Sequence, residues 1–269
     1  MMDILQTKYD GYRFSEKEER IYNPFSLCNA FENKELNDYW FSSGTPTFMV
    51  KLLEQKYFEL SDMEGNIRIS ARSIDDYRVN YEDITPLLFQ SGYLTIKNYD
   101  TQYDMYVLGF PNDEVRYGFL ENLLPAYAAV PFGETGKSVW QFVEDVRKGN
   151  VNGFMERMQS LIAGISYDNF SSKELKLREQ NYQTAVYLIF KLMGQFVQTE
   201  IHCSTGRADC VVQTADSIYI FEFKLSGTGS AENAIAQIQK QNYAAKYKTD
   251  GKKIVLIGAG FDEATRTIK

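Results

Sequence analysis

The sequence is poor in the residues that build the commonest nucleophilic sites. Of 269 residues, three are cysteine and one is histidine. The cysteines, Cys28, Cys203 and Cys210, follow no metal-binding spacing, and we expect Cys203 and Cys210 to be buried free thiols. His202 faces no obvious acid or cysteine partner, so the sequence gives no support to a Ser/His or Cys/His mechanism. We therefore interpret His202 as a structural residue.

Long apolar runs are also missing. No stretch approaches the ~20 residues that a helix needs to span a membrane. Residues 1–5 lack the basic region and the apolar core of a signal peptide. The sequence therefore predicts a cytoplasmic protein with no membrane contact. Hydrophobic residues make up 44% of the chain and aromatic residues 14%, which is typical of an ordered globular protein.

An excess of positive charge is missing as well. The formal net charge is −7, which does not by itself indicate nucleic-acid binding. The charge is uneven along the chain. Residues 171–269 carry 13 Lys or Arg against 10 Asp or Glu, out of totals of 29 and 36, so the acidic excess lies before residue 171.

Two runs near the end of the chain predict a β-hairpin. Residues 207–213 and 218–225 are rich in β-branched and aromatic residues, and a turn sequence separates them. If Ala215–Asp216 form a two-residue loop, the numbering fixes the register of the pairing. Asp209 then lies directly opposite Glu222.

Two carboxylates opposite each other in a sheet repel, which disfavours the pairing unless a cation lies between them. Mg²⁺ and Mn²⁺ prefer carboxylate oxygens, so Asp209 and Glu222 predict a divalent metal site. Lys224 shares the face of Glu222 and could hold an attacking water or stabilise charge on a phosphate. The alternative is a solvated polar face, in which Arg207 and Lys224 form surface ion pairs with the two acids. The opposite face is apolar and predicts a core beneath the site: Phe221, Phe223 and Leu225.

Asp209, followed by a turn and Glu222-Phe223-Lys224, resembles the metal-binding signature of the PD-(D/E)XK nuclease superfamily. Ala208 stands where the family usually has proline. Gly-Arg-Ala-Asp before the hairpin is typical of bacterial proteins that couple an AAA-ATPase-like domain to such a nuclease domain. The resemblance implies Mg²⁺ or Mn²⁺ as the cofactor, bound by Asp209, Glu222 and the main-chain carbonyl of Phe223, with Lys224 as a catalytic residue.

A helix expected over residues 173–193 carries a further acid. Glu179 lies three residues before Tyr182, so it falls on the inward-facing stripe of this helix. In the family, a helix Glu followed by an aromatic residue three positions later completes the metal site. The resemblance thus implies that Glu179 is catalytic and binds metal. The alternative is a first-turn acid that the helix dipole favours.

A second helix, expected over residues 230–247, supplies candidates for nucleic-acid contacts. Gln237 and Tyr243 match the family's Gln-Ile spaced before a Tyr, while Gln239 with Tyr243 is a competing match to a related nuclease motif. In relatives such residues contact the site and the phosphate backbone. The resemblance thus implies nucleic-acid binding by Gln237, Tyr243 and Arg207. Without it, Gln237 and Tyr243 would be interpreted as helix surface.

Two aromatic turn motifs lie near the N-terminus, at residues 9–14 and 22–26, and we expect Ser26 to cap a short helix. Both resemble the tail of the AAA-ATPase-like domain of the same family. No phosphate-binding loop precedes them, so the chain resembles a truncated or split version without the ATPase body. Residues 133–138 end like such a loop, but Pro131 stands where its first glycine belongs.

These observations predict three parts. Residues 1–44 would be a remnant of the AAA-ATPase-like domain. Residues 45–137 would form a mostly helical, winged-helix-like linker domain with a β-hairpin, in which residues 61–82 are irregular with one short helix. Residues 138–269 would form the nuclease-like domain. Its order of helix, strand, hairpin, helix and strand predicts an α/β fold (α+β mixed), a restriction-endonuclease-like core with a mixed central sheet.

Two functions remain open at this stage. The first is a Mg²⁺-dependent nuclease that hydrolyses phosphodiester bonds of nucleic acid, with DNA as the expected substrate. The second is a catalytically inactive nuclease-fold module for interaction or regulation, acting with an ATPase partner or as a self-dimer. Net acidity and the aromatic N-terminal segment motivate the second function, and the intact Asp209, Glu222 and Lys224 favour the first.

Overall fold

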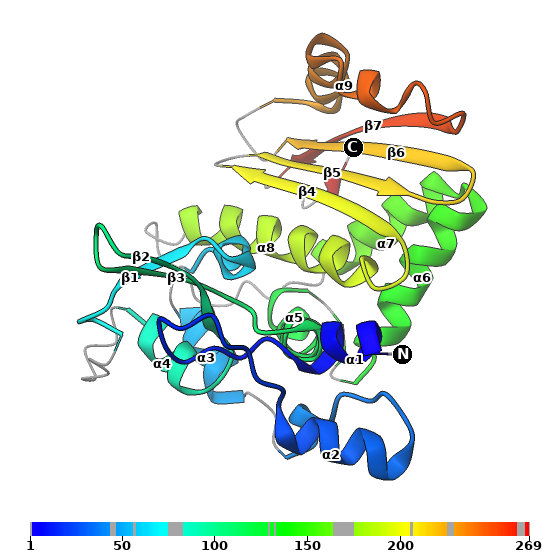
Figure 1. The fold of residues 1–269 in the computed structure, drawn as a ribbon. Helices are drawn as coiled ribbons and strands as arrows, with labels where there is room; N and C mark the ends of the chain where they lie inside the picture. The colour runs from blue at the N-terminus through cyan, green and yellow to red at the C-terminus, as the bar shows by residue number, and fades with distance from the viewer. Residues whose placement is uncertain are drawn as a thin grey trace. The chain divides into compact units, whose positions relative to one another are not determined.

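A computed structural model gives the fold of the chain (Figure 1). The structure describes residues 2–43, 47–55, 58–74, 83–128, 130–131, 133–163, 175–204, 207–224, 229–262 and 267–268. The chain divides into two compact units, Met1–Phe119 and Leu120–Lys269. The three-part division expected above, with an ATPase-like remnant at the start, stays a prediction.

The first unit combines short helices with a three-stranded antiparallel sheet. The sheet has the order β1-β3-β2, and the pairing of β2 with β3 confirms the hairpin expected in this region. The elements are α1 (Met2–Tyr9), α2 (Pro24–Asn33), η1 (Tyr39–Ser43), α3 (Thr47–Gln55), η2 (Leu60–Glu64), β1 (Ile67–Ser70), α4 (Thr85–Gln90), β2 (Thr95–Asp100) and β3 (Met105–Gly109). Helix α5 (Asp113–Tyr127) follows and crosses into the second unit.

Helix α2 begins earlier than expected, and the prediction that Ser26 caps it is wrong. The side chain of Asn23 is the cap: its Oδ1 accepts hydrogen bonds from the backbone N–H groups of Phe25 at 3.0 Å and Ser26 at 3.3 Å. Asparagine caps helices as well as serine does, and Pro24 suits the first helical position because its fixed φ is already helical. Ser26 is instead fully buried in the first turn.

Strand β1 was also not expected, because residues 61–82 were predicted to be irregular. Ile67 and Ile69 are buried and pair with Leu108 and Tyr106 of β3. A four-residue strand has too little local signal to be recognised. Its pairing partner lies about forty residues away, so only the tertiary structure supplies it.

In the described part of the second unit, three helices follow α5, and after them come a five-stranded sheet and one more helix. Its elements are α6 (Thr135–Lys148), α7 (Val151–Ala163), α8 (Leu175–Met193), β4 (Gln198–Ser204), β5 (Arg207–Gln213), β6 (Ser217–Lys224), α9 (Ala231–Gln241), η4 (Tyr243–Tyr247), β7 (Lys253–Asp262) and β8 (Thr267–Ile268). The strands have the order β4-β5-β6-β7-β8; β6 and β7 are parallel, and the other pairs are antiparallel. This mixed sheet agrees with the predicted restriction-endonuclease-like fold.

The two faces of this sheet are covered by different helices. Helix α8 lies across one face and α9 lies on the other (Figure 1). Toward α7 and α8, Phe221 of β6 packs 5.0 Å from the rings of Phe154 and Phe190. Toward α9, Ile218 and Ile220 pack with Ile238 in a second cluster. The aromatic core predicted beneath the site is therefore confirmed for Phe221 and, at 5.9 Å from Phe190, for Phe223; Leu225 lies outside the described residues.

Helix α9 is shorter than predicted. It begins with a capping box formed by Ser230 and Asn233 but ends at Gln241, where Asn242 has a φ of 52°. Asparagine tolerates this left-handed conformation and commonly ends helices. Residues 243–247 then continue as the 3₁₀ turn η4, which places Tyr243 outside the helix.

Among the described helices, none combines the length and the apolar content that crossing a bilayer requires. Of the two cysteines whose side chains are described, Cys210 is buried and Cys28 is exposed, and both are free thiols. The prediction of a buried free thiol is confirmed for Cys210. The side chain of Cys203 lies outside the described set.

Candidate functional site

The hairpin of β5 and β6 fixes the geometry of the candidate site. Its loop contains two residues, Ala215 and Asp216, because the N–H of Thr214 donates to the carbonyl of Ser217 at 2.8 Å. The hydroxyl of Thr214 also accepts a hydrogen bond from the Ser217 N–H at 3.1 Å. This closed turn sets the register along the whole ladder.

The register places the predicted residues opposite one another. Asp209 pairs with Glu222, and Arg207 pairs with Lys224. The predicted pairing of Asp209 with Glu222 and the predicted two-residue loop are therefore confirmed. Residues that oppose each other in an antiparallel ladder belong to the same face of the sheet. Positions 207, 209, 222 and 224 thus share the face that carries α9.

Glu222 and Lys224 form a buried ion pair on this face. The carboxylate of Glu222 is 0% exposed, and the Lys224 residue is 8% exposed. The ammonium Nζ of Lys224 donates to Oε1 of Glu222 at 2.8 Å. The predicted alternative of a solvated polar face does not hold for these two side chains, because both are buried.

Burial of this pair has an energetic consequence. Removing two charges from water costs several kcal/mol per ion, and the attraction between them repays that cost only in part. A pair of apolar side chains would fill the same space at no such cost. A buried ion pair is therefore weak evidence for stability, and Glu222 and Lys224 are candidates for a functional site.

Gln237 of α9 is the second partner of the lysine. Its side-chain Oε1 accepts a hydrogen bond from Nζ of Lys224. Gln237 thus lies at the site, whereas Gln239, two residues further along α9, is exposed. Of the two competing motif matches, Gln237 and not Gln239 is the residue that contacts Lys224. The predicted contact of Gln237 with nucleic acid stays a prediction.

Tyr243 has different surroundings. It is half-buried and packs against the apolar cluster of Val211, Ile220 and Ile238 beneath α9. Its predicted contact with nucleic acid stays a prediction. The same holds for Arg207, whose strand position is known but whose side chain lies outside the described set.

The side chains of the other predicted acids also lie outside the described set. Asp209 is placed by its strand register, and Glu179 by its position in the first half of α8. Strand β4 follows α8 after the turn at residues 194–197 and runs back along the helix. Position 179 therefore lies toward the end of the sheet where β4 leads into β5, which is also the end that carries positions 209 and 222. The predicted ligand role of Glu179 stays a prediction.

The donor set fits a hard divalent cation in its chemistry. Carboxylates and a main-chain carbonyl are the ligands that Mg²⁺ and Mn²⁺ prefer, and Glu222 supplies a buried carboxylate directly opposite the aspartate position. Among the side chains that the structure describes, no group of three His, Cys, Asp or Glu could hold a metal ion. Phe223 lies between Ala208 and Ala259 in the sheet, and its predicted carbonyl ligand stays a prediction.

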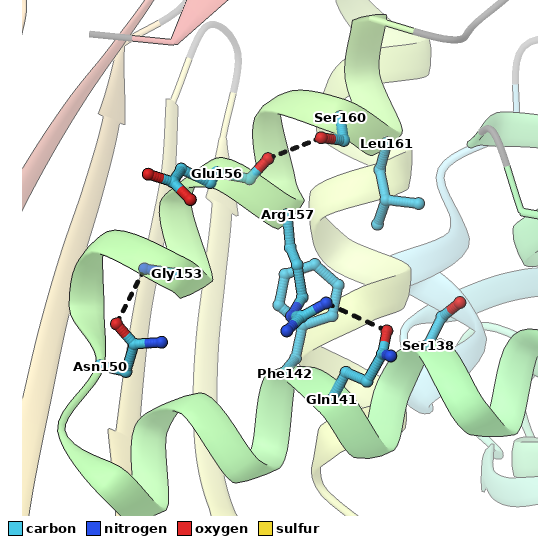
Figure 2. Close-up of a pocket in the computed structure, with 9 residues that line it drawn as sticks. All are labelled: Ser138, Gln141, Phe142, Asn150, Gly153, Glu156, Arg157, Ser160 and Leu161. Atoms are coloured by element: carbon cyan, nitrogen blue, oxygen red, sulfur yellow. Dashed lines mark hydrogen bonds between the residues drawn. The ribbon is translucent and has the colours of Figure 1, made fainter.

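A separate cavity of about 490 Å³ lies between α6 and α7 (Figure 2). Arg157, which lines the cavity, donates to Gln141 at 3.1 Å and to Asp145 at 2.7 Å. Its lining residues are Ser138, Gln141, Phe142, Asn150, Gly153, Glu156, Arg157, Ser160 and Leu161. Because α7 packs on the Phe221 side of the sheet, this cavity lies away from Glu222 and Lys224.

Comparison with known proteins gives two findings. Residues 177–269 match the model of the PD-(D/E)XK nuclease superfamily, so the resemblance stated from Asp209, Glu222 and Lys224 is confirmed for that part of the chain. Over 268 residues the chain is 30% identical to a protein of Azotobacter chroococcum mcd 1 described as an uncharacterised protein in the vnfD 5′ region. The match covers 99% of this chain and 51% of that protein, so the chain spans about half the length of this relative. No solved structure matches.

Proposed function

We propose that the PD-(D/E)XK superfamily domain in this chain is an active nuclease that hydrolyses phosphodiester bonds with the help of a divalent metal ion. One observation carries the proposal: Glu222, which forms a buried ion pair with Lys224 at 2.8 Å, lies directly opposite the strand position of Asp209. An acid, a second acid and an amine on one face of a hairpin are the groups that this reaction needs.

In this proposal Asp209, Glu222 and the carbonyl of Phe223 hold Mg²⁺ or Mn²⁺, and Glu179 completes the ligand set. The ion would polarise a phosphate oxygen and lower the pKa of a bound water. Lys224 orients the attacking water and stabilises negative charge that develops on the phosphate. Hydrolysis adds the hydroxyl of water to phosphorus and returns a proton to the departing oxygen.

We further propose DNA in the cytoplasm as the substrate, with an ATPase as a partner. The Lys and Arg excess after residue 170 supports nucleic-acid binding near the site. The length of the Azotobacter relative, about twice that of this chain, supports a further domain or partner protein.

A cleavage assay tests the nuclease. Single- and double-stranded DNA are incubated with the protein and Mg²⁺ or Mn²⁺, and we expect strand scission that Asp209→Ala and Lys224→Ala abolish. Asp216→Ala is the matched control, since Asp216 is an exposed acid in the loop of the same hairpin, and it should cleave as well as the wild type. Cleavage that survives in both site variants would remove the mechanism.

A second function has one observation in its favour. In the first unit, α1 and α2 expose large apolar side chains, among them Ile4 at 56%, Phe25 at 49% and Phe31 at 63%. Such surface is typical of a binding face, so the alternative is an inactive nuclease-fold module that binds an ATPase or a second copy of itself. Titration calorimetry without Mn²⁺ binding, together with a dimer mass by light scattering, would support this alternative over the nuclease.

A further inference from the structure

Helix α9 approaches the sheet closely beside the candidate site. In the parallel pairing of β6 with β7, Gly258 pairs with Glu222 and Gly260 pairs with Lys224. A Cβ atom on Gly258 would lie 2.5 Å from the carbonyl oxygen of Ala231, and one on Gly260 would lie 2.9 Å from the Ala231 nitrogen. Both distances are too short for any side chain. The two glycines therefore let the first turn of α9 rest directly on β7.

This close packing of α9 on β7 determines which α9 side chain reaches the ion pair of Glu222 and Lys224. Gln237 lies less than two turns beyond Ala231, on the side of α9 that faces β6, and its neighbour Ile238 is buried against Ile220. The Oε1 atom of Gln237 accepts a hydrogen bond from Lys224. The ammonium of Lys224 is thus held by two elements, through Glu222 on its own strand and through Gln237 on the helix.

The chemistry of the two acceptors differs. A lysine ammonium has three N–H groups that rotate about the end of a flexible stem. Glu222 and Gln237 take two of them in the described contacts, which leaves one direction for a water or a phosphate oxygen. Because Gln237 is neutral, it fixes the ammonium without adding negative charge to a site that must receive a phosphate.

We propose that Gln237 is a positioning residue for Lys224: it orients the lysine ammonium through a hydrogen bond from α9, and it does not itself bind nucleic acid. The effect of Gln237 on catalysis rests on the nuclease function proposed above. The effect of Gln237 on the orientation of the Lys224 ammonium is expected also in the protein without metal or substrate. The close packing of α9 on Gly258 and Gly260 places Gln237 within hydrogen-bonding distance of Lys224.

The matched variants are Gln237→Met, Gln237→Glu and Gln239→Ala. Methionine has the length of glutamine but no comparable acceptor, and glutamate restores an oxygen acceptor. Gln239 is exposed on the same helix. Hydrogen bonding slows the exchange of ammonium protons with water, so the ¹⁵N resonance of the Lys224 side chain, assigned by its loss in Lys224→Met, reports the contact in the metal-free full chain.

We expect Gln237→Met to broaden or abolish this resonance, and Gln237→Glu and Gln239→Ala to retain it. In DNA cleavage, Gln237→Met should lower kcat by about 10- to 100-fold, as expected for a misplaced catalytic group, with KM for DNA within twofold of the wild type. A raised KM with unchanged kcat would overturn the proposal in favour of direct nucleic-acid binding. An unchanged Lys224 resonance in Gln237→Met would also overturn it. If the resonance behaves as expected while no variant or wild type cleaves DNA, the positioning role stands and the nuclease function fails.

Discussion

At the scale of single residues, the informative feature is where charge is buried. Glu222 and Lys224 are held in the interior within 2.8 Å of each other, although an apolar pair would be easier to bury. The carboxylate of Glu114 in the first unit is also fully buried. One of its oxygens accepts the N–H of Trp40 at 3.0 Å. The two buried acids differ because Glu222 has a cationic partner at hydrogen-bond distance.

Glu114 gives a prediction about pH. Burial is the main reason that the pKa of Glu114 is raised above the ordinary value of 4.5, and the hydrogen bond from the Trp40 N–H lowers it in part. The folded state therefore keeps a proton on Glu114 to higher pH than the unfolded state does. Stability from this group is complete below pH 4.5 and is lost as the pH rises through the raised folded-state pKa. We expect Glu114→Gln to raise the free energy of unfolding at pH 7.

Urea unfolding at pH 7 and pH 4 measures this difference. The gain in Glu114→Gln should shrink at pH 4, where the wild-type carboxyl is protonated in both states. Glu32→Gln is the control, because Glu32 lies on the exposed surface of α2 and should change stability little at either pH. A glutamine variant less stable than the wild type at pH 7 would contradict the prediction and show that the ionised carboxylate is the favoured partner of Trp40.

At the scale of elements, two local features build the site. The two-residue loop at Ala215–Asp216 sets the register of β5 and β6, and so brings position 209 opposite Glu222. The glycines of β7 let α9 approach the same face. The loop depends only on residues that are neighbours in the sequence. The contact of the β7 glycines with α9 joins segments about thirty residues apart.

Gly258→Ala tests the close packing of α9 on β7. The new Cβ would meet the Ala231 carbonyl at 2.5 Å and the Ile235 backbone nitrogen at 2.9 Å, and backbone atoms cannot move aside as a flexible side chain can. We expect a loss of about 1–3 kcal/mol in the free energy of unfolding, as is usual for overpacking. The Lys224 resonance should weaken as well, since Gln237 moves with the helix.

The matched control is Gly136→Ala in α6. Its Cβ would have only Glu121 nearby, at an ordinary 3.5 Å, and alanine favours a helix over glycine by roughly 0.5–1 kcal/mol. Urea unfolding should therefore show the two substitutions acting in opposite directions. Equal stability of Gly258→Ala and the wild type would mean that α9 does not rest on β7 as described.

At the scale of the whole molecule, the net charge and the length of the relative bear on the proposed function. The net charge of −7 opposes nucleic acid at long range, so the nucleic-acid binding proposed above would depend on local charge and on a cation at the site. Lys and Arg outnumber Asp and Glu only after residue 170. The Azotobacter relative is about twice as long as this chain. Both points are consistent with the proposal above of a nuclease that acts with a partner.

Metal binding should stabilise the whole chain. A ligand that binds only the folded state adds about 2.7 kcal/mol at a concentration of 100 Kd, so Mn²⁺ should raise the melting temperature measured by calorimetry. Asp209→Ala should remove this shift, while Asp216→Ala should keep it. An equal shift in both variants would place the bound ion elsewhere on the protein, away from the hairpin.

The sequence by itself determined the hairpin, its register and the identity of the superfamily signature. These depend on neighbouring residues: a two-residue loop fixes every pair along β5 and β6. The cap of α2 was assigned to the wrong residue, because Asn23 and Ser26 are both good caps and local preference cannot separate them.

Only the tertiary structure decided which residues surround the ion pair. The contact of Gln237 with Lys224 depends on the close approach of α9 to β7, which Gly258 and Gly260 permit. Strand β1 likewise exists because β3 pairs with it across about forty residues. Such contacts join segments far apart in the chain, and their free energy appears only when the fold brings those segments together.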